Sequence, residues 1–358
     1  MLIRKLWTSS TAMLESAFSI GVTRQKFTSK MLSDAQIAGF ENIRMYADAS
    51  KSEVRASQQM FIPDTGSRRA NYLALSAGGD GGAYGAGYLN GWSARGDRPS
   101  FDMVTGVSSG AFIAPFAFVG KSADAKLASF FQNGMASQME SRNSLLQGAL
   151  GQSIYPSGPM IALIKSQVDD SLIDQVGERY RAGARLLVLS TNLDAGRGVI
   201  WNLGAVAASD QSARYDLFRN VLRASASIPA FFPPTEIVSQ NGDDELIELH
   251  VDGGAIRQLF FLPDAALSTT EAQYFLPNEK PNFYVIVNQG LTPDFTMARG
   301  QTLAIGRRAY DILIRNSTHE NLTADFEFAH VHGIPFQMTH IPASLSELVT
   351  CPPRLPHS

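Results

Sequence analysis

The sequence predicts an α/β fold, a three-layer α/β/α sandwich with a mostly parallel central sheet. Three observations carry this prediction. From about residue 70 to residue 315, short apolar runs alternate with longer stretches of helical periodicity, an order typical of parallel sheets. Hydrophobic residues make up 44% and charged residues 18% of the 358 positions, which suits a large buried core. At residues 101–113 a predicted strand runs through a sharp turn directly into a predicted helix.

The chain divides into three predicted regions. Residues 1–67 form a partly helical N-terminal extension, closed by the turn-rich stretch 63–67 and expected to pack on the α/β domain. Residues 68–316 form that domain, and residues 317–358 show no regular pattern, so an irregular C-terminal segment is predicted there. Within the domain we expect strands at 72–76, 101–105, 185–191, 198–203, 245–251 and 283–288, and helices at 123–139, 160–180, 215–224 and 302–315.

The run Gly106-Val107-Ser108-Ser109-Gly110 matches Gly-x-Ser-x-Gly between a predicted strand and a predicted helix, the order of a nucleophile elbow. The turn forces unusual backbone angles on its serine, so the residues two places to either side must be small. Ser108 has glycine at both places, whereas Ser109 has valine and alanine. The pattern therefore favours Ser108 as a nucleophile over Ser109.

A glycine-rich loop, residues 77–87, lies directly after the predicted strand 72–76. No frame of it gives the Gly-x-Gly-x-x-Gly of dinucleotide sites, and it lacks the lysine of a phosphate-binding P-loop, so no nucleotide is expected. Two interpretations stay open. The loop supplies backbone N–H groups to an oxyanion, or it is only a tight turn from strand to helix.

A third loop, Asp252-Gly253-Gly254, comes after the predicted strand 245–251. Ligands of open α/β sheets bind at the carboxyl ends of strands, so all three loops could converge on one crevice. Asp-Gly is also a common turn dipeptide, so an ordinary turn is the alternative for Asp252. Asp194 is the fallback carboxylate, although we expect it to close a strand and shape the rim of the site.

Taken together, these blocks resemble the patatin-like phospholipase family. The matching elements occur in family order: Leu75-Ser76-Ala77-Gly78-Gly79, Gly106-Val107-Ser108-Ser109-Gly110, Ala224-Ser225-Ala226-Ser227-Ile228-Pro229 and Asp252-Gly253-Gly254. The resemblance implies a patatin-like fold with residues 68–316 as its catalytic domain. It further implies a Ser–Asp dyad, with Ser108 as nucleophile and Asp252 as general base, and an oxyanion hole at Gly78 and Gly79.

The implied activity is hydrolysis of lipid acyl esters, as a phospholipase A or a lipid acyl hydrolase, through an acyl-enzyme. A lipid or phospholipid ester is the expected partner, and neither a metal nor a cofactor is expected. The loop departs from the family pattern, because Ala77 replaces its first glycine and Gly81 stands where a basic residue is usual. This departure puts the headgroup preference in question more than the reaction class.

Two other functions stay open. One is an ordinary Ser–Asp–His esterase or lipase, whose histidine would lie late in the chain. We expect surface or structural roles for the late histidines, which are His319, His330, His332 and His340. His250 alternates with Asp252 along a predicted strand and so shares its face. The other alternative is a catalytically silent lipid-binding protein. Core packing is the default role for the aromatic residues that could instead line an acyl pocket, namely Phe231, Phe232, Trp92 and Trp201.

Charge and hydropathy limit the remaining partners. The net charge of −3 implies no general attraction to nucleic acid or to anionic lipid. The single cysteine, Cys351, excludes an internal disulfide. No apolar run reaches the roughly 18 residues of a membrane span, and Glu15 interrupts the only segment resembling a signal peptide. We therefore expect a cytoplasmic or peripheral protein whose contact with membranes is transient and at their surface.

Overall fold

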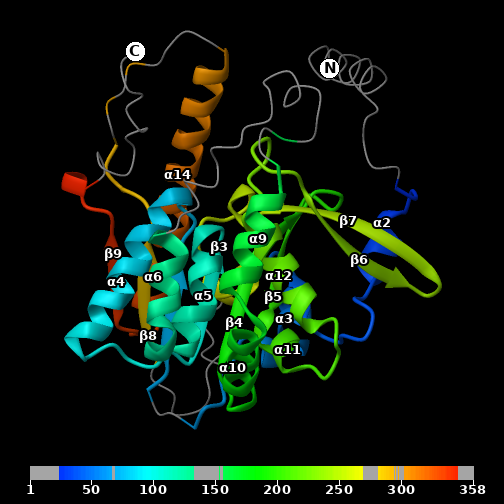
Figure 1. Cartoon of the computed structure of the whole chain (residues 1–358), viewed down its shortest axis with the longest axis horizontal. Helices are drawn as coiled ribbons and strands as arrows, with labels where there is room; N and C mark the ends of the chain where they lie inside the picture. Colours follow the sequence, from blue (N-terminus) through cyan, green and yellow to red (C-terminus); the bar gives the residue numbers. More distant parts are fainter. Residues whose placement is uncertain are drawn as a thin grey trace.

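This computed structural model describes residues 24–66, 69–132, 156–268, 281–293 and 302–345, together with positions 153, 295 and 297. Among them, nine strands form one sheet whose main path runs β1-β5-β4-β3-β2-β8-β9, and the hairpin β6–β7 joins it through β4 (Figure 1). The strands are β1 (Arg44–Tyr46), β2 (Asn71–Leu75), β3 (Met103–Val107), β4 (Arg185–Asn192), β5 (Arg197–Asn202), β6 (Thr235–Asn241), β7 (Asp244–Asp252), β8 (Asn282–Val287) and β9 (Phe336–His340).

The sheet is mostly parallel at its centre. Strands β4, β3, β2, β8 and β9 pair in parallel, while β5 and β7 pair with β4 in antiparallel fashion. The predicted strands are all present within a few residues of their expected bounds. Each central strand is buried over most of its length, which explains its continuous apolar sequence.

Successive residues of each central strand face two different cores, as the two-residue period of a strand requires. Leu73 and Val104 belong to one core, and Tyr72 and Met103 to the other. The first core is closed by α4 (Gly82–Arg95), α5 (Ser109–Val119), α6 (Asp124–Gln132), α9 (Gly158–Gln167), α10 (Asp170–Arg181), α11 (Leu203–Ala208) and α12 (Arg214–Ser225). The second is closed by α3 (Lys51–Ala56), α13 (Asp264–Leu267) and α14 (Thr302–Val331). The predicted three-layer α/β/α sandwich is confirmed.

One predicted helix is two helices in the structure. The stretch 160–180 breaks at Val168 and Asp169, because the Asp169 side chain caps α10 by accepting a hydrogen bond from the backbone N–H of Leu172 at 2.9 Å. The predicted helix 123–139 is present as α6 up to Gln132, and its remainder lies outside the described residues.

The N-terminal extension contains α2 (Ser29–Asp34) and α3, and its strand β1 joins the sheet beside β5. At the other end, the prediction of an irregular segment after residue 316 is wrong for residues 317–345. Helix α14 continues to Val331, and β9 pairs in parallel with β8. The strand escaped the sequence analysis because β9 has only five residues, lies at the edge of the sheet and buries none of them fully, so it lacks the continuous apolar run of the central strands. In the part of the chain that the structure describes, no helix is both long enough and apolar enough to cross a membrane.

Candidate functional site

Ser108 occupies the sharp turn between β3 and α5. Its φ of 55° lies in the left-handed region that favours glycine, and its ψ is −120°. A Cβ added to Gly106 would lie 2.6 Å from the carbonyl oxygen of Gly110, and one added to Gly110 would lie 2.2 Å from that of Leu75. No side chain fits at either glycine. The structure thus has the strand, turn and helix that the sequence predicts, with Ser108 at the strained position.

Asp252 ends β7 and lies beside this turn, although 144 positions separate it from Ser108. The Ser108 hydroxyl donates a hydrogen bond to Asp252 Oδ2 at 2.6 Å. The other carboxylate oxygen, Oδ1, accepts from the backbone N–H of Gly254 at 2.7 Å. Both side chains are buried, because Ser108 is 4% and Asp252 3% exposed. Two of the predicted site residues are therefore in direct contact.

Burial raises the pKa of the Asp252 carboxyl to about 7, although the hydrogen bonds from Ser108 and Gly254 act in the opposite direction. A carboxylate with a pKa near neutrality is a stronger base than an ordinary aspartate. When ionised, it is suited to accept a proton from the hydroxyl beside it.

Two serines of the block 224–229 hold this pair, a role that the sequence analysis did not assign. Ser225 Oγ accepts a hydrogen bond from the Ser108 backbone N–H at 3.0 Å. The carbonyl of Ser227 accepts from the Asp252 backbone N–H at 2.9 Å. The Thr191 hydroxyl completes the support by donating to the Asp252 carbonyl at 2.9 Å. The block 224–229 therefore holds the backbones of both Ser108 and Asp252. Its match to the family pattern was the signal in the sequence that could have revealed this role.

The glycine loop is held by Asn288, which lies directly after β8 and was not singled out from the sequence. Its backbone N–H donates to Ser76 Oγ at 2.8 Å, and its Nδ2 donates to the Ser76 carbonyl at 2.7 Å. A Cβ on Gly78 would lie 2.1 Å from the Asn288 carbonyl oxygen, so the loop needs glycine there. A Cβ on Gly79 would meet nothing within 4 Å, so space does not demand glycine there. Its φ of +55° does, because that backbone conformation favours glycine.

The packing around Gly81 explains why this chain lacks the basic residue that the family usually has at this position. A Cβ at this position would lie 2.0 Å from the Asn288 carbonyl oxygen. In this chain, therefore, the loop has no room for the arginine or lysine that the family pattern usually has. The departure from the family pattern is built into the packing of the loop against β8.

Gln258 joins three parts of the site. Its carbonyl accepts from the Ala77 N–H of the glycine loop at 2.8 Å. Its side-chain amide donates to the Gly254 carbonyl at 2.7 Å, and its backbone N–H donates to Asn321 Oδ1 of α14 at 2.8 Å. The glycine loop, the Asp-Gly-Gly loop and α14 thus meet at one residue.

Comparison with known proteins identifies the family of the chain. The model of the patatin-like phospholipase family matches residues 73–263, which is more than half of the chain. The chain belongs to this family. Among solved structures, VipD from Legionella pneumophila is similar, with a TM-score of 0.35 and 11% identity over 68% of this chain. The chain spans about half the length of VipD, 52%. No curated protein sequence matches the chain significantly.

Membership of the patatin-like family supports a lipid hydrolase function. The matched region begins in β2 and ends just before α13, so it contains the glycine loop, the elbow and the Asp-Gly-Gly loop. In the part of the chain that is described, no cluster of three or more histidine, cysteine or acidic residues could hold a metal ion.

The other polar residues considered from the sequence lie elsewhere in the patatin-like domain. His250 is fully buried, with Nδ1 2.9 Å from Ser190 Oγ and Nε2 3.1 Å from Glu248 Oε2. Arg44 also forms an ion pair with Glu248. Burial raises the pKa of the Glu248 carboxyl, but His250 and Arg44 together lower it to about 2. Asp194 forms an ion pair with Arg24 at 2.8 Å. Neither His250 nor Asp194 hydrogen-bonds to Ser108 in the described chain.

The tryptophans considered as pocket residues pack in the core. Trp201 is fully buried, and its Nε1 donates to Ser190 Oγ at 2.8 Å. Trp92 packs on Phe101 and Tyr284, with ring centroids 6.0 and 5.4 Å away. Of the two phenylalanines in the 224–234 stretch, Phe232 is buried and Phe231 is 37% exposed.

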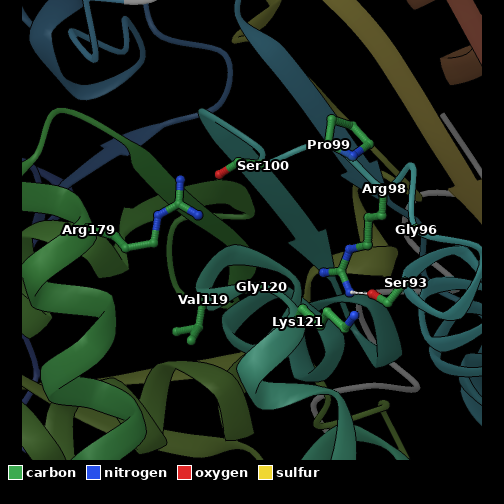
Figure 2. A pocket seen from close by; sticks show the side chains of 9 residues that line it. All are labelled: Ser93, Gly96, Arg98, Pro99, Ser100, Val119, Gly120, Lys121 and Arg179. Carbon is green, nitrogen blue, oxygen red and sulfur yellow. Dashed lines mark hydrogen bonds between the residues drawn. The ribbon is translucent and has the colours of Figure 1, made fainter.

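A cavity of about 280 Å³ lies at the other end of the central strands from Ser108, where β3 and β4 begin (Figure 2). Arg98 and Arg179 reach it from opposite sides, and Lys121 lies between them in the view. Arg98 donates to the Ala117 carbonyl at 3.1 Å and Arg179 to that of Phe118 at 2.6 Å. Both arginines thus cap the C-terminus of α5, the helix that begins directly after Ser108.

Proposed function

We propose that this chain is a lipid acyl hydrolase, a phospholipase A or a less specific lipid esterase, that works through a Ser108–Asp252 dyad. The observation that carries the proposal is the 2.6 Å hydrogen bond from the Ser108 hydroxyl to Asp252 Oδ2, formed at a strained turn between two buried side chains. Family membership supports the lipid ester as substrate class.

In the first half-reaction, ionised Asp252 accepts the proton of the Ser108 hydroxyl while Oγ attacks the ester carbonyl carbon. The tetrahedral intermediate collapses, the bond to the alcohol oxygen breaks, and Asp252 returns the proton to that leaving oxygen. An acyl-enzyme on Ser108 remains. In the second half-reaction, Asp252 takes a proton from water, the resulting hydroxyl attacks the acyl carbon, and the proton returns to Ser108 as the fatty acid leaves.

The negative charge on the carbonyl oxygen needs donors in both half-reactions. We assign this role to the backbone N–H groups of Gly78 and Gly79. Support comes from the packing of the loop beside the elbow: a Cβ on Gly110 would approach both the Leu75 and Ser76 carbonyl oxygens, at 2.2 and 2.7 Å. Losing one such donor typically lowers the turnover rate about 10² to 10³-fold.

Two serine variants test the proposal. Ser108→Ala should abolish labelling by a fluorophosphonate probe and hydrolysis across a panel of phospholipid, glyceride and nitrophenyl esters. Ser109→Ala is the matched control, because its Oγ is buried without a hydrogen-bond partner in the described chain and its loss should leave activity unchanged. Labelling that survives in Ser108→Ala and disappears in Ser109→Ala would refute the assignment. A wild-type protein that no probe labels and that cleaves no ester would favour a silent lipid-binding protein.

A further inference from the structure

The N-terminal half of α14 carries an apolar stripe on its exposed side. Ile305, Ile312 and Leu313 are 51%, 43% and 66% exposed, and with exposed Ala309 they fall at helical spacing on one side. Figure 1 shows these first turns, in orange, extending past the end of α4 that is nearest the glycine loop. The chain leading into the helix also exposes apolar side chains, because Phe295 is 94% and Met297 82% exposed. Large side chains left in water over several turns indicate a contact surface.

The other side of the same helix faces the proposed active site. Tyr310 is half-buried, and burial together with the charge of Asp252 raises the pKa of its phenol to about 12. Further along, Thr318 is buried, and Asn321 accepts the hydrogen bond from Gln258 that ties α14 to both catalytic loops. Positions 310, 314, 317, 318 and 321 follow the helical repeat, on the side away from the exposed stripe.

The charge of this segment favours an anionic partner. Between residues 302 and 319 the sequence has three arginines, at 307, 308 and 315, and a single acidic residue, Asp311, although the whole chain carries a net charge of −3. By helical spacing, Arg308 and Arg315 lie along one side of the stripe, and basic residues beside an apolar stripe are typical of helices that lie in the interface of an anionic membrane.

We propose that the exposed stripe of α14, formed by Ile305, Ala309, Ile312 and Leu313, docks the enzyme on the surface of anionic lipid. This inference rests on the proposed function, because it is the lipid ester that brings the enzyme to such a surface. The stripe enters the interface while the opposite side of α14 stays against the catalytic loops, so the docked helix holds the site at the lipid surface. Ser108 is 4% exposed, so a lipid must leave the bilayer to reach it.

Vesicle binding tests the docking separately from catalysis. In a Ser108→Ala background, which removes hydrolysis, co-sedimentation is measured with vesicles of phosphatidylcholine alone and with added phosphatidylglycerol. The double variant Ile312→Ser/Leu313→Ser should bind the anionic vesicles at least tenfold more weakly. A matched control is Val238→Ser/Ile161→Ser, because these two residues are 46% and 40% exposed on β6 and α9 and should leave binding unchanged.

Hydrolysis separates the two proposals. With Ser108 intact, the α14 double variant should lose vesicle hydrolysis about tenfold, yet cleave a short-chain nitrophenyl ester in solution at the normal rate. Equal vesicle binding by this variant and the control would overturn the docking surface. So would a wild-type dimer that the same substitutions convert to a monomer without any effect on vesicles. Vesicle binding that depends on α14, in a wild-type protein that cleaves no ester, would refute the proposed function alone.

Discussion

Replacing Asp252 by asparagine is the sharpest test of the dyad. The amide has nearly the same size, and its Oδ1 can still accept the hydrogen bond from Gly254 N–H that measures 2.7 Å in the wild type. Its Nδ2 would occupy the place of the oxygen that now accepts from Ser108. An amide nitrogen there can donate a hydrogen bond but cannot accept a proton, so the variant keeps the shape and loses the base.

The expected loss is set by the role of that base. General-base catalysis by a positioned side chain contributes about 10²- to 10⁴-fold in rate. We expect kcat/KM for ester hydrolysis to fall by about 10³-fold, or about 4 kcal/mol of transition-state stabilisation. Folding should not suffer, because the variant removes a carboxyl whose pKa burial raises to about 7 despite its hydrogen bonds from Ser108 and Gly254, so its ionised form is costly to bury at pH 8. Thermal unfolding, measured beside the kinetics, should give a Tm at pH 8 no lower than that of the wild type.

The late histidines supply the matched controls. His319 Nε2 lies 3.0 Å from the Leu291 carbonyl, and His340 Nδ1 lies 3.0 Å from the Ile341 carbonyl. His330 stacks on Phe326, and His332 packs at 4.4 Å from the ring of Phe328. Each alanine variant of these four histidines should therefore keep kcat/KM within about tenfold, since removing a true triad histidine costs several orders of magnitude.

Two results would refute the reasoning. One late histidine whose removal abolishes activity would establish a triad and reduce Asp252 to orienting that histidine. Full activity in Asp252→Asn would exclude it as the base. His250 is not a clean control, because its ring links Ser190 to Glu248 in the core and its loss should destabilise the sheet beside β7.

Three further predictions concern protonation and packing. Because Asp252 must be ionised and its pKa is about 7, kcat/KM should rise about tenfold per pH unit below pH 7 and level off above it; a profile flat from pH 5 to 9 would contradict this. Gly81→Arg should reduce turnover at least about tenfold with every headgroup, because the new Cβ would lie 2.0 Å from the Asn288 carbonyl oxygen. The control Ala83→Arg, at an exposed position of α4, should keep normal turnover. A Gly81→Arg enzyme that only changes its headgroup preference would show that the loop can adapt. Burial also raises the pKa of Asp325 to about 7, so the folded state loses stability as pH rises from about 4 to about 7; Asp325→Asn should raise the Tm at pH 8 more than at pH 5, and equal shifts at both would show that the charge is not responsible.

The sequence by itself determined the features that depend on neighbours along the chain. The elbow could be predicted because its requirement is local: Ser108 needs glycine two places to either side. The order of strands and helices was likewise visible, since the central strands are buried on both faces and read as continuous apolar runs. The cap at Asp169 was missed: an aspartate before a helical run is a usual start signal, but the predicted helix 160–180 passed through it.

Only the tertiary structure decided which distant residues meet. The 2.6 Å contact between Ser108 and Asp252 depends on β7 pairing with β4, a register that no local pattern specifies. The same holds for Asn288, whose carbonyl excludes a side chain at Gly81 because β8 pairs beside β2. Strand β9 became recognisable only through its pairing with β8, because a short edge strand that buries none of its residues fully lacks the continuous apolar run that marks the central strands.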